Sequence, residues 1–241
     1  MFPARVVFGV GTGESLNEVP ATGLKWPGFK ERQSRLRESI ELMRRLWSEE
    51  RVTFEGQYYR TQAATIYDRP EQPVPIWIAA SGPTAAAMAG ELAEGFICTS
   101  GKGDALYRDT LLPKVEEGLR RAGRPGNSIE RMIEVKVSFD IDPDRAKEDT
   151  RHWAALALTP EEKMSVEDPR EMERLADALP LDRAASRWIV SADPEEQLAQ
   201  IRAYVELGFT HLVFHAPGPD QARFLKLYAE RVLPLLRAKL G

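Results

Sequence analysis

Five short apolar runs divide the chain into alternating strand-like and helix-like stretches. They cover residues 6–10, 74–80, 95–99, 132–140 and 211–216. Two of these runs, VPIWIAA and HLVFHA, are apolar almost throughout, which is typical of a parallel strand covered on both faces. Because helical stretches lie between and after the runs, the pattern predicts an α/β fold with a parallel sheet.

The helix signals are equally local. Residues 29–48 carry apolar positions at helical spacing, with Arg and Glu on the opposite face. Asp193 followed by Pro194 predicts a helix start, and the last helix is expected over about residues 220–236. The segment RVTFEGQYYR, residues 51–60, predicts a small hairpin that turns at its Glu-Gly pair.

The number of strands leaves two architectures open. An eight-fold βα barrel needs on the order of 250 residues, whereas a doubly wound sheet tolerates five strands. Residues 141–190 contain several helical pieces and two proline-marked breaks, so we interpret them as a helical insertion within a single domain that covers residues 1–241.

Composition and net charge limit the classes of binding partner that we expect for this protein. The net charge of −4 does not favour a general polyanion-binding surface, so no nucleic-acid partner is expected. No apolar stretch approaches the roughly 18 residues of a membrane span, and we expect no membrane partner. Cys98 is the only cysteine, which excludes an intrachain disulfide and favours a reducing, cytoplasmic location.

The first candidate loop is GVGTGESLNE, residues 9–18, directly after an apolar run. Its glycines permit a sharp turn or close approach to a ligand. The third glycine of a dinucleotide fingerprint is missing, and Glu14 would repel a pyrophosphate. Glu14 therefore either favours the N-terminus of a helix or acts on whatever binds beside it.

Two further loops follow predicted strands. CTSGKG, residues 98–103, combines small residues with Lys102, which suits a phosphate; a plain solvated turn is the alternative. AASGPTAAA, residues 79–87, offers small side chains against which a flat cofactor can lie; close packing of a helix on the sheet is the alternative.

Other chemistries find little support. His211 and His215 flank a strand and do not have metal-ligand spacing, so we interpret them as structural, and we predict no metal site. Neither a GxSxG motif nor a Cys–His arrangement for acyl transfer is present.

Taken together and in this order, the loops resemble the coenzyme F420-dependent glucose-6-phosphate dehydrogenases of the luciferase-like barrel superfamily. The most specific segments are GFICTSGKG and LVFHAPGPDQ, and the similarity covers essentially the whole chain. It implies a luciferase-like (β/α)8 TIM barrel of which this chain holds about strands four to eight and the helical insertion. Family members carry roughly a third more barrel at the N-terminus, so this N-terminal third is expected to be missing.

The resemblance also implies site residues. Glu14 matches the catalytic carboxylate beside the deazaflavin ring. Positions that contact coenzyme F420 match Thr12, Gly13, Asn17, Ser81, Gly82, Thr84 and Ala85. Positions that contact the sugar phosphate match Thr99, Lys102, Lys163 and Arg187. Met164 stands where the family carries a histidine, which puts the choice among sugar 6-phosphates in question.

The implied reaction transfers a hydride from C1 of glucose 6-phosphate to F420 and gives the lactone, with Glu14 as an acid–base group. Two alternatives remain open. One is an F420- or FMN-dependent oxidoreductase that acts on another sugar phosphate or alcohol. The other is a non-catalytic partial barrel, because missing strands would expose two sheet edges. Family members are expected to form homodimers.

Overall fold

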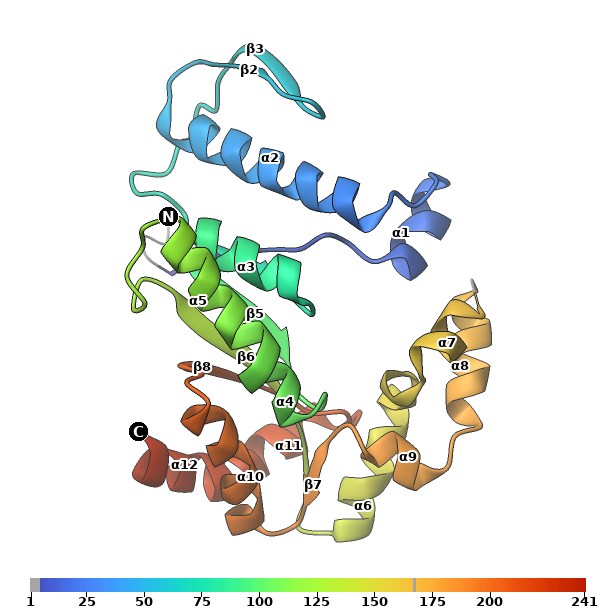
Figure 1. Ribbon diagram of the computed structural model, residues 1–241. Helices are drawn as coiled ribbons and strands as arrows, with labels where there is room; N and C mark the ends of the chain where they lie inside the picture. The colour runs from blue at the N-terminus through green and yellow to red at the C-terminus, as the bar shows by residue number, and fades with distance from the viewer. Residues whose placement is uncertain (1–4, 167) are drawn as a thin grey trace. The chain divides into compact units, whose positions relative to one another are not determined.

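The computed structural model describes residues 5–166 and 168–241; the side chains of Leu16, Asn17 and Met164 also lie outside the description. The chain divides into two compact units, Met1–Phe96 with Lys114–Ile129, and Ile97–Pro113 with Glu130–Gly241 (Figure 1). Strand β5 (Gly95–Thr99) contributes residues to both units. The grouping of residues 1–241 into one barrel domain with an insertion at 141–190 stays a prediction.

The first unit contains a pair of parallel strands. β1 (Phe8–Val10) pairs with β4 (Ile76–Ala79), with Gly9 opposite Trp77. β4 is the apolar core strand, since Ile76 and Ile78 are completely buried. Both strands were predicted from their apolar runs and are confirmed, although they are shorter than the runs.

Helix α2 (Phe29–Ser48) and the hairpin of β2 (Val52–Glu55) and β3 (Arg60–Ala64) confirm two further predictions. The hairpin lies beside α2 (Figure 1), and Glu38 of that helix fixes the turn. Its carboxylate accepts hydrogen bonds of 2.7–3.0 Å from the backbone N–H groups of residues 57, 58 and 59. The Glu38 carboxylate thus satisfies three backbone N–H groups of the turn that have no partner in the hairpin ladder.

Two glycines allow helices α3 (Pro83–Leu92) and α5 (Leu112–Arg121) to pack with their backbones in contact. A Cβ atom at Gly90 would lie 2.1 Å from the Val115 carbonyl oxygen, and one at Gly118 would lie 2.0 Å from the Ala87 carbonyl oxygen. The small residues of α3 are buried against this contact. Close packing therefore accounts for most of the small residues after β4.

Gly118→Ala is expected to lower the free energy of unfolding by about 1–3 kcal/mol, because the added methyl group must push two helices apart. The usual effect of Gly→Ala inside a helix is the opposite, a gain of about 1 kcal/mol. Urea unfolding measures the difference, and Arg120→Ala on the exposed face of α5 serves as the control. Equal or greater stability of Gly118→Ala would show that the helices do not meet here.

The second unit is organised around β6 (Glu130–Phe139). β8 (His211–His215) runs parallel to its first part, with Lys136 opposite His215. β7 (Ile189–Ser191) runs parallel to its last three residues. With β5, all five predicted strands are present, and the short β7 was not predicted. The parallel pairs in both units confirm the predicted α/β class.

Short helices connect the strands of this unit. The segment between β6 and β7 is mostly helical, and α10 begins after Asp193, whose carboxylate accepts the Glu195 N–H at 2.9 Å as predicted. The helices are α4 (Asp104–Leu106), η1 (Tyr107–Leu111), α6 (Pro143–Glu148), η2 (Asp149–Ala157), α7 (Pro160–Met164), α8 (Pro169–Asp177), α9 (Leu181–Ala185) and α10 (Pro194–Glu206). In the first unit, α1 (Ser15–Thr22) follows β1.

The last helix extends to residue 240 and contains a π-helical turn. α11 (Gln221–Leu227) continues through η3 (Tyr228–Val232) into α12 (Leu233–Leu240). Pro234 cannot donate a backbone hydrogen bond, and its ring crowds the carbonyl of the preceding turn. The wider turn before the proline relieves this crowding. A second π-helical turn, η1, precedes Pro113 in the same way.

A partly buried ion pair joins the end of β6 to α11. Arg223 donates from Nε and from a terminal nitrogen to the two oxygens of Asp140, at 2.6 and 2.8 Å. The Asp140 side chain is only 5% exposed. These hydrogen bonds from Arg223 outweigh the effect of burial and hold the pKa of Asp140 below its usual value.

Asp140→Asn is expected to lower the free energy of unfolding at neutral pH by about 1–2 kcal/mol, because Arg223 loses its two hydrogen bonds to a carboxylate but stays partly hydrated and near Asp220. A lowered native-state pKa gives stability that is complete above the ordinary Asp pKa and is lost as the pH falls through the lowered value. The difference between variant and parent should therefore shrink only below about pH 4. Urea unfolding at several pH values measures this, with Asp109→Asn as the control; a constant difference would contradict it.

Candidate functional site

The predicted coenzyme loops lie at one edge of the β1–β4 pair. Because these strands are parallel, their carboxyl ends point the same way, and Thr12 and Ser81 each follow such an end. A Cβ atom at Gly11 would lie 3.7 Å from the Ala79 Cβ, so the two loops start side by side. The first unit thus brings the beginnings of both predicted loops together.

Gly13 is required by the local backbone and by a neighbouring carboxylate. Its φ is +81°, and a Cβ atom there would lie 2.4 Å from Glu18 Oε1. The same Glu18 oxygen accepts the Glu14 backbone N–H at 2.9 Å. Glu14 occupies the N-cap position of α1, but its side chain makes no capping hydrogen bond. The Glu14 side chain therefore does not cap the helix, and its catalytic role stays a prediction.

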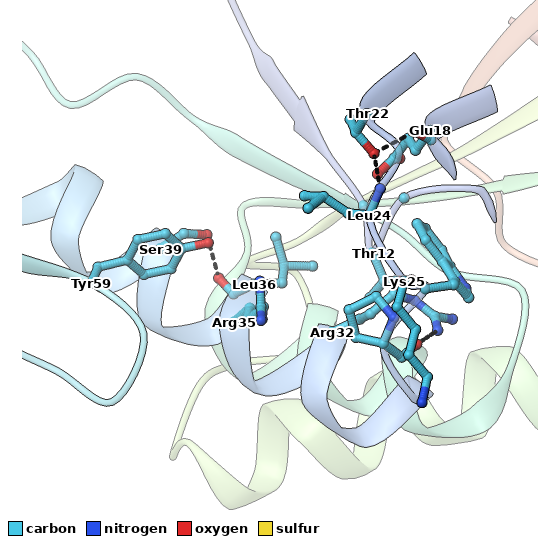
Figure 2. A pocket seen from close by; sticks show the side chains of 14 residues that line it. Thr12, Glu18, Thr22, Leu24, Lys25, Arg32, Arg35, Leu36, Ser39 and Tyr59 are labelled. Atoms are coloured by element: carbon cyan, nitrogen blue, oxygen red, sulfur yellow. Dashed lines mark hydrogen bonds between the residues drawn. The ribbon is translucent and has the colours of Figure 1, made fainter. Parts of the chain in front are cut away.

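A pocket of about 480 Å³ opens beside this turn, between α1, the following loop and α2 (Figure 2). Thr12 and Gly13 line it, together with the cationic side chains of Lys25, Arg32 and Arg35. The Arg32 guanidinium lies 4.6 Å from the centre of the Trp26 ring. Cations and aromatic faces suit a ligand that has both a flat ring and negative charge.

The second coenzyme loop is divided between two environments. Thr84 lines a different pocket of about 510 Å³, with Arg37, Lys114 and Arg121. Ala85 is buried in α3. A Cβ atom at Gly82 would meet nothing within 4 Å in the described part of the chain, so the fold itself does not demand a glycine there. Asn17 lies in α1, and its side chain is outside the description.

In the second unit, the loop after β5 is held by hydrogen bonds on two sides. The Ser100 N–H donates to the Glu134 carbonyl at 2.8 Å, and the Lys136 N–H donates to the Ser100 hydroxyl at 2.8 Å. Beneath the loop, the buried Tyr107 hydroxyl donates to the Thr99 carbonyl at 2.8 Å and accepts the Lys102 N–H at 3.2 Å. This framework positions the backbone of the predicted phosphate loop.

The loop places Lys102 beside Arg187. Gly101 has φ +76°, and a Cβ atom there would lie 2.6 Å from the Arg187 carbonyl and 3.4 Å from its Nε. Partial burial of the ammonium, followed by repulsion from Arg187, lowers the pKa of Lys102, although much of its side chain is exposed. The buried Nε of Arg187 finds no hydrogen-bond acceptor among the described residues. Two predicted phosphate ligands are thus brought together.

Lys163, the third predicted cation, lies half-buried on α7. Its neighbour Met164 lies outside the description of side chains. The assignment of Lys163 to a phosphate, and the effect of Met164 on sugar choice, stay predictions.

Several residues near Lys102 and Arg187 were not predicted as site residues from the sequence. They are Lys136 and Glu134 of β6, His215 of β8, and the tryptophans Trp153 and Trp188 that pack against His215. Lys136 is only 3% exposed in the middle of β6. His215 Nδ1–H donates to Glu134 at 2.6 Å, and the His215 ring packs edge-on against Trp153 and Trp188 at 4.7 and 5.2 Å. The only sequence signal was the alternation of Glu134, Lys136 and Ser138 on one face of a strand, which also describes an ordinary solvent-facing surface.

Cys98 lies under the same cluster and is an unreactive thiol. Burial raises its pKa to about 12, and the charges of Lys102 and Lys136 only partly oppose this. A nucleophilic cysteine needs a lowered pKa, so Cys98 is part of the packing. In the part of the chain that the structure describes, no group of His, Cys, Asp and Glu is arranged to hold a metal ion, and no helix is long and apolar enough to cross a membrane.

The chain is similar to known proteins over most of its length. The family model of the luciferase-like monooxygenases matches residues 1–211. The chain is 63% identical over 241 residues to an F420-dependent glucose-6-phosphate dehydrogenase of Nakamurella multipartita. The aligned region covers 100% of this chain and 71% of that protein. The chain is 60% identical to the enzyme of the same name from Intrasporangium calvum, covering 98% of the chain and 71% of the relative.

Among solved structures, an F420-dependent secondary alcohol dehydrogenase in complex with an F420–acetone adduct superimposes with a TM-score of 0.87. It is 32% identical, and the match covers 98% of this chain and 71% of that one. The predicted luciferase-like α/β architecture is thereby confirmed.

Tyr107→Phe tests the framework of the phosphate loop. Loss of the hydroxyl leaves the Thr99 carbonyl and the Lys102 N–H without this partner, which should lower the free energy of unfolding by about 1–2 kcal/mol. Chemical denaturation measures the change, and Tyr67→Phe, at a side chain that is 94% exposed, is the control. An unchanged stability would contradict a structural role for this hydroxyl.

Proposed function

Because the chain belongs to the luciferase-like monooxygenase family and, within it, to the F420-dependent glucose-6-phosphate dehydrogenases, we propose that it oxidises glucose 6-phosphate at C1 and transfers the hydride to coenzyme F420. The product is the 6-phosphogluconolactone. The observation that carries the proposal is the pairing of Lys102 with Arg187 at the carboxyl end of β5, where the Arg187 Nε lacks an acceptor among the described residues.

The phosphate accounts for this arrangement. A desolvated phosphate dianion offers several oxygens, and a guanidinium and an ammonium together bind it strongly. Thr99, at the end of the same strand, contacts the sugar in our proposal. Lys163 supplies a third cation, as the family resemblance implies.

The coenzyme site belongs to the other two loops. Thr12, Gly13 and Asn17 on the first loop, and Ser81, Gly82, Thr84 and Ala85 on the second, hold F420 in our proposal. The open space at Gly82 and the aromatic and cationic pocket beside Gly13 support the fit. When bound, F420 supplies a deazaflavin ring that accepts a hydride.

Glu14 is the acid–base residue of the proposed reaction. Oxidation at C1 would require a group that takes the hydroxyl proton, and a bound F420 would require a proton or a nearby charge at its ring; Glu14 would serve one of these two needs. A carboxylate positioned for proton transfer contributes roughly 10²–10⁴-fold to the rate. Glu14 is exposed at the carboxyl end of β1, where it is accessible to a ligand bound by the adjacent loops.

A second candidate is oxidation of a non-phosphorylated alcohol, since the superimposed secondary alcohol dehydrogenase shares the architecture. The paired cations favour the phosphorylated substrate, because a neutral alcohol would leave both charges without a partner. A third candidate is a non-catalytic binding protein, which would bind the ligand but would not oxidise it.

We further propose that the enzyme is a homodimer in the cytoplasm and acts on a small molecule without nucleic-acid or membrane partners. The family resemblance supports the dimer. The single, buried cysteine and the net charge of −4 support the location and the absence of polyanionic partners.

The loss of F420 absorbance on addition of glucose 6-phosphate tests the proposed reaction. Glu14→Gln should lower the rate by at least 100-fold, whereas Glu50→Gln, an exposed matched change, should leave it unchanged. Glucose without the phosphate should react far more slowly. No absorbance loss with glucose 6-phosphate or with other sugar 6-phosphates would sink the dehydrogenase proposal and favour the binding protein.

A further inference from the structure

Lys136 is a cation buried in the middle of strand β6. Strand positions beside it, such as Val135 and Val137, are completely buried apolar residues. The Lys136 side chain is itself only 4% exposed. Burial is the main cause of its lowered pKa. A lysine at such a position is costly unless something in the site requires its charge.

The Lys136 ammonium has no hydrogen-bond acceptor among the residues that the structure describes. Its nearest carboxylate oxygen, on Glu134, is 3.6 Å away, beyond hydrogen-bond range. That same oxygen receives the shorter 2.6 Å bond from His215. Glu134 is therefore committed to the histidine, and it compensates Lys136 only through space.

The backbone ties Lys136 to both predicted phosphate ligands of this unit. The backbone N–H of Lys136 donates a hydrogen bond to the hydroxyl of Ser100, which lies two positions before Lys102. The intervening Gly101 packs against Arg187. Burial lowers the pKa of Lys136, the Glu134 carboxylate opposes this, and charge repulsion from Arg187 and from Lys102 adds to the lowering. Lys102, Lys136 and Arg187 are thus close enough to act on one another, and the carboxylate that pairs with Lys136 is that of Glu134.

A second buried donor belongs to the same cluster. Trp188 follows Arg187 and is 8% exposed, and its indole Nε1 likewise lacks an acceptor in the described ranges. Its ring packs edge-on against His215, which lies opposite Lys136 in the β6–β8 register. Orphaned donors on Lys136, Arg187 and Trp188 therefore belong to one connected set of contacts. Donors without acceptors, together with three cations that act on one another, call for an anion with several oxygens.

We propose that Lys136 is a further phosphate-binding residue, whose ammonium joins Lys102 and Arg187 on the 6-phosphate of the substrate. The inference rests on the proposed function, since it assigns a residue to the same anion site. Lys136 forms a 3.6 Å ion pair with Glu134, but its buried ammonium makes no hydrogen bond to an acceptor among the described residues, and a phosphate oxygen would supply one.

Binding of inorganic phosphate to the purified chain, measured by isothermal titration calorimetry, tests the assignment without turnover or coenzyme. Lys136→Met removes the charge while keeping an unbranched side chain of similar length. It should weaken phosphate binding at least tenfold. Lys226→Met, at an exposed lysine of the same unit, should bind phosphate like the parent. Thermal unfolding without phosphate should show Lys136→Met to be as stable as the parent or more stable, because an incompletely paired buried charge has been removed.

The outcomes separate the two proposals. If the parent chain binds phosphate and Lys136→Met binds it equally well, the role of Lys136 is overturned while the phosphate site stands. If the parent binds neither inorganic phosphate nor glucose 6-phosphate, the proposed function fails first. Should Lys136→Met not fold, the double variant Glu134→Gln, Lys136→Met removes both charges and carries the same comparison. Parent-like affinity in that variant would overturn the assignment, and a tenfold loss would support it.

Discussion

Parallel strand pairing is the constraint on which the candidate chemistry depends. Strands that run in the same direction end at the same edge, so loops distant in sequence begin side by side. In the first unit, this places Gly11, after β1, beside Ala79 at the end of β4, so the two loops begin together. In the second, the pairing of β6 with β8 puts His215 opposite Lys136. An antiparallel arrangement would send alternate loops to opposite edges.

Much of the fold followed from local patterns. Apolar runs located all five strands because a strand packed on at least one face carries apolar side chains at frequent positions, even where polar residues alternate with them as in β6. The start of α10 followed from a residue pair whose capping geometry is intrinsic, Asp193 and Pro194. β7 escaped notice because three residues are too few for a pattern. The π-helical turns escaped because they depend on how a proline is accommodated, and the same proline can also begin a helix.

Only some residues of the candidate site could be predicted from the sequence. Loops after strands pointed to Glu14 and Lys102, since small residues and charges at such positions are informative. Arg187 and Lys163 came from family resemblance, because an isolated arginine or lysine looks the same on any surface. Lys136 was missed for a physical reason. Its alternation with Glu134 fits a solvated face equally well, and only the structure shows that this face is covered.

The π-helical turn in the last helix has a consequence for its length. Its buried residues Tyr228, Val232 and Leu236 recur at intervals of four, whereas an ordinary α-helix of 3.6 residues per turn would let such a row drift around the axis. One wider turn takes up that drift and keeps the three side chains facing the core. The sequence of this helix therefore determines the angular position of its apolar side chains around the axis as well as their hydrophobicity. Deleting a single residue from the segment would rotate everything after it away from the core, even with every apolar side chain retained.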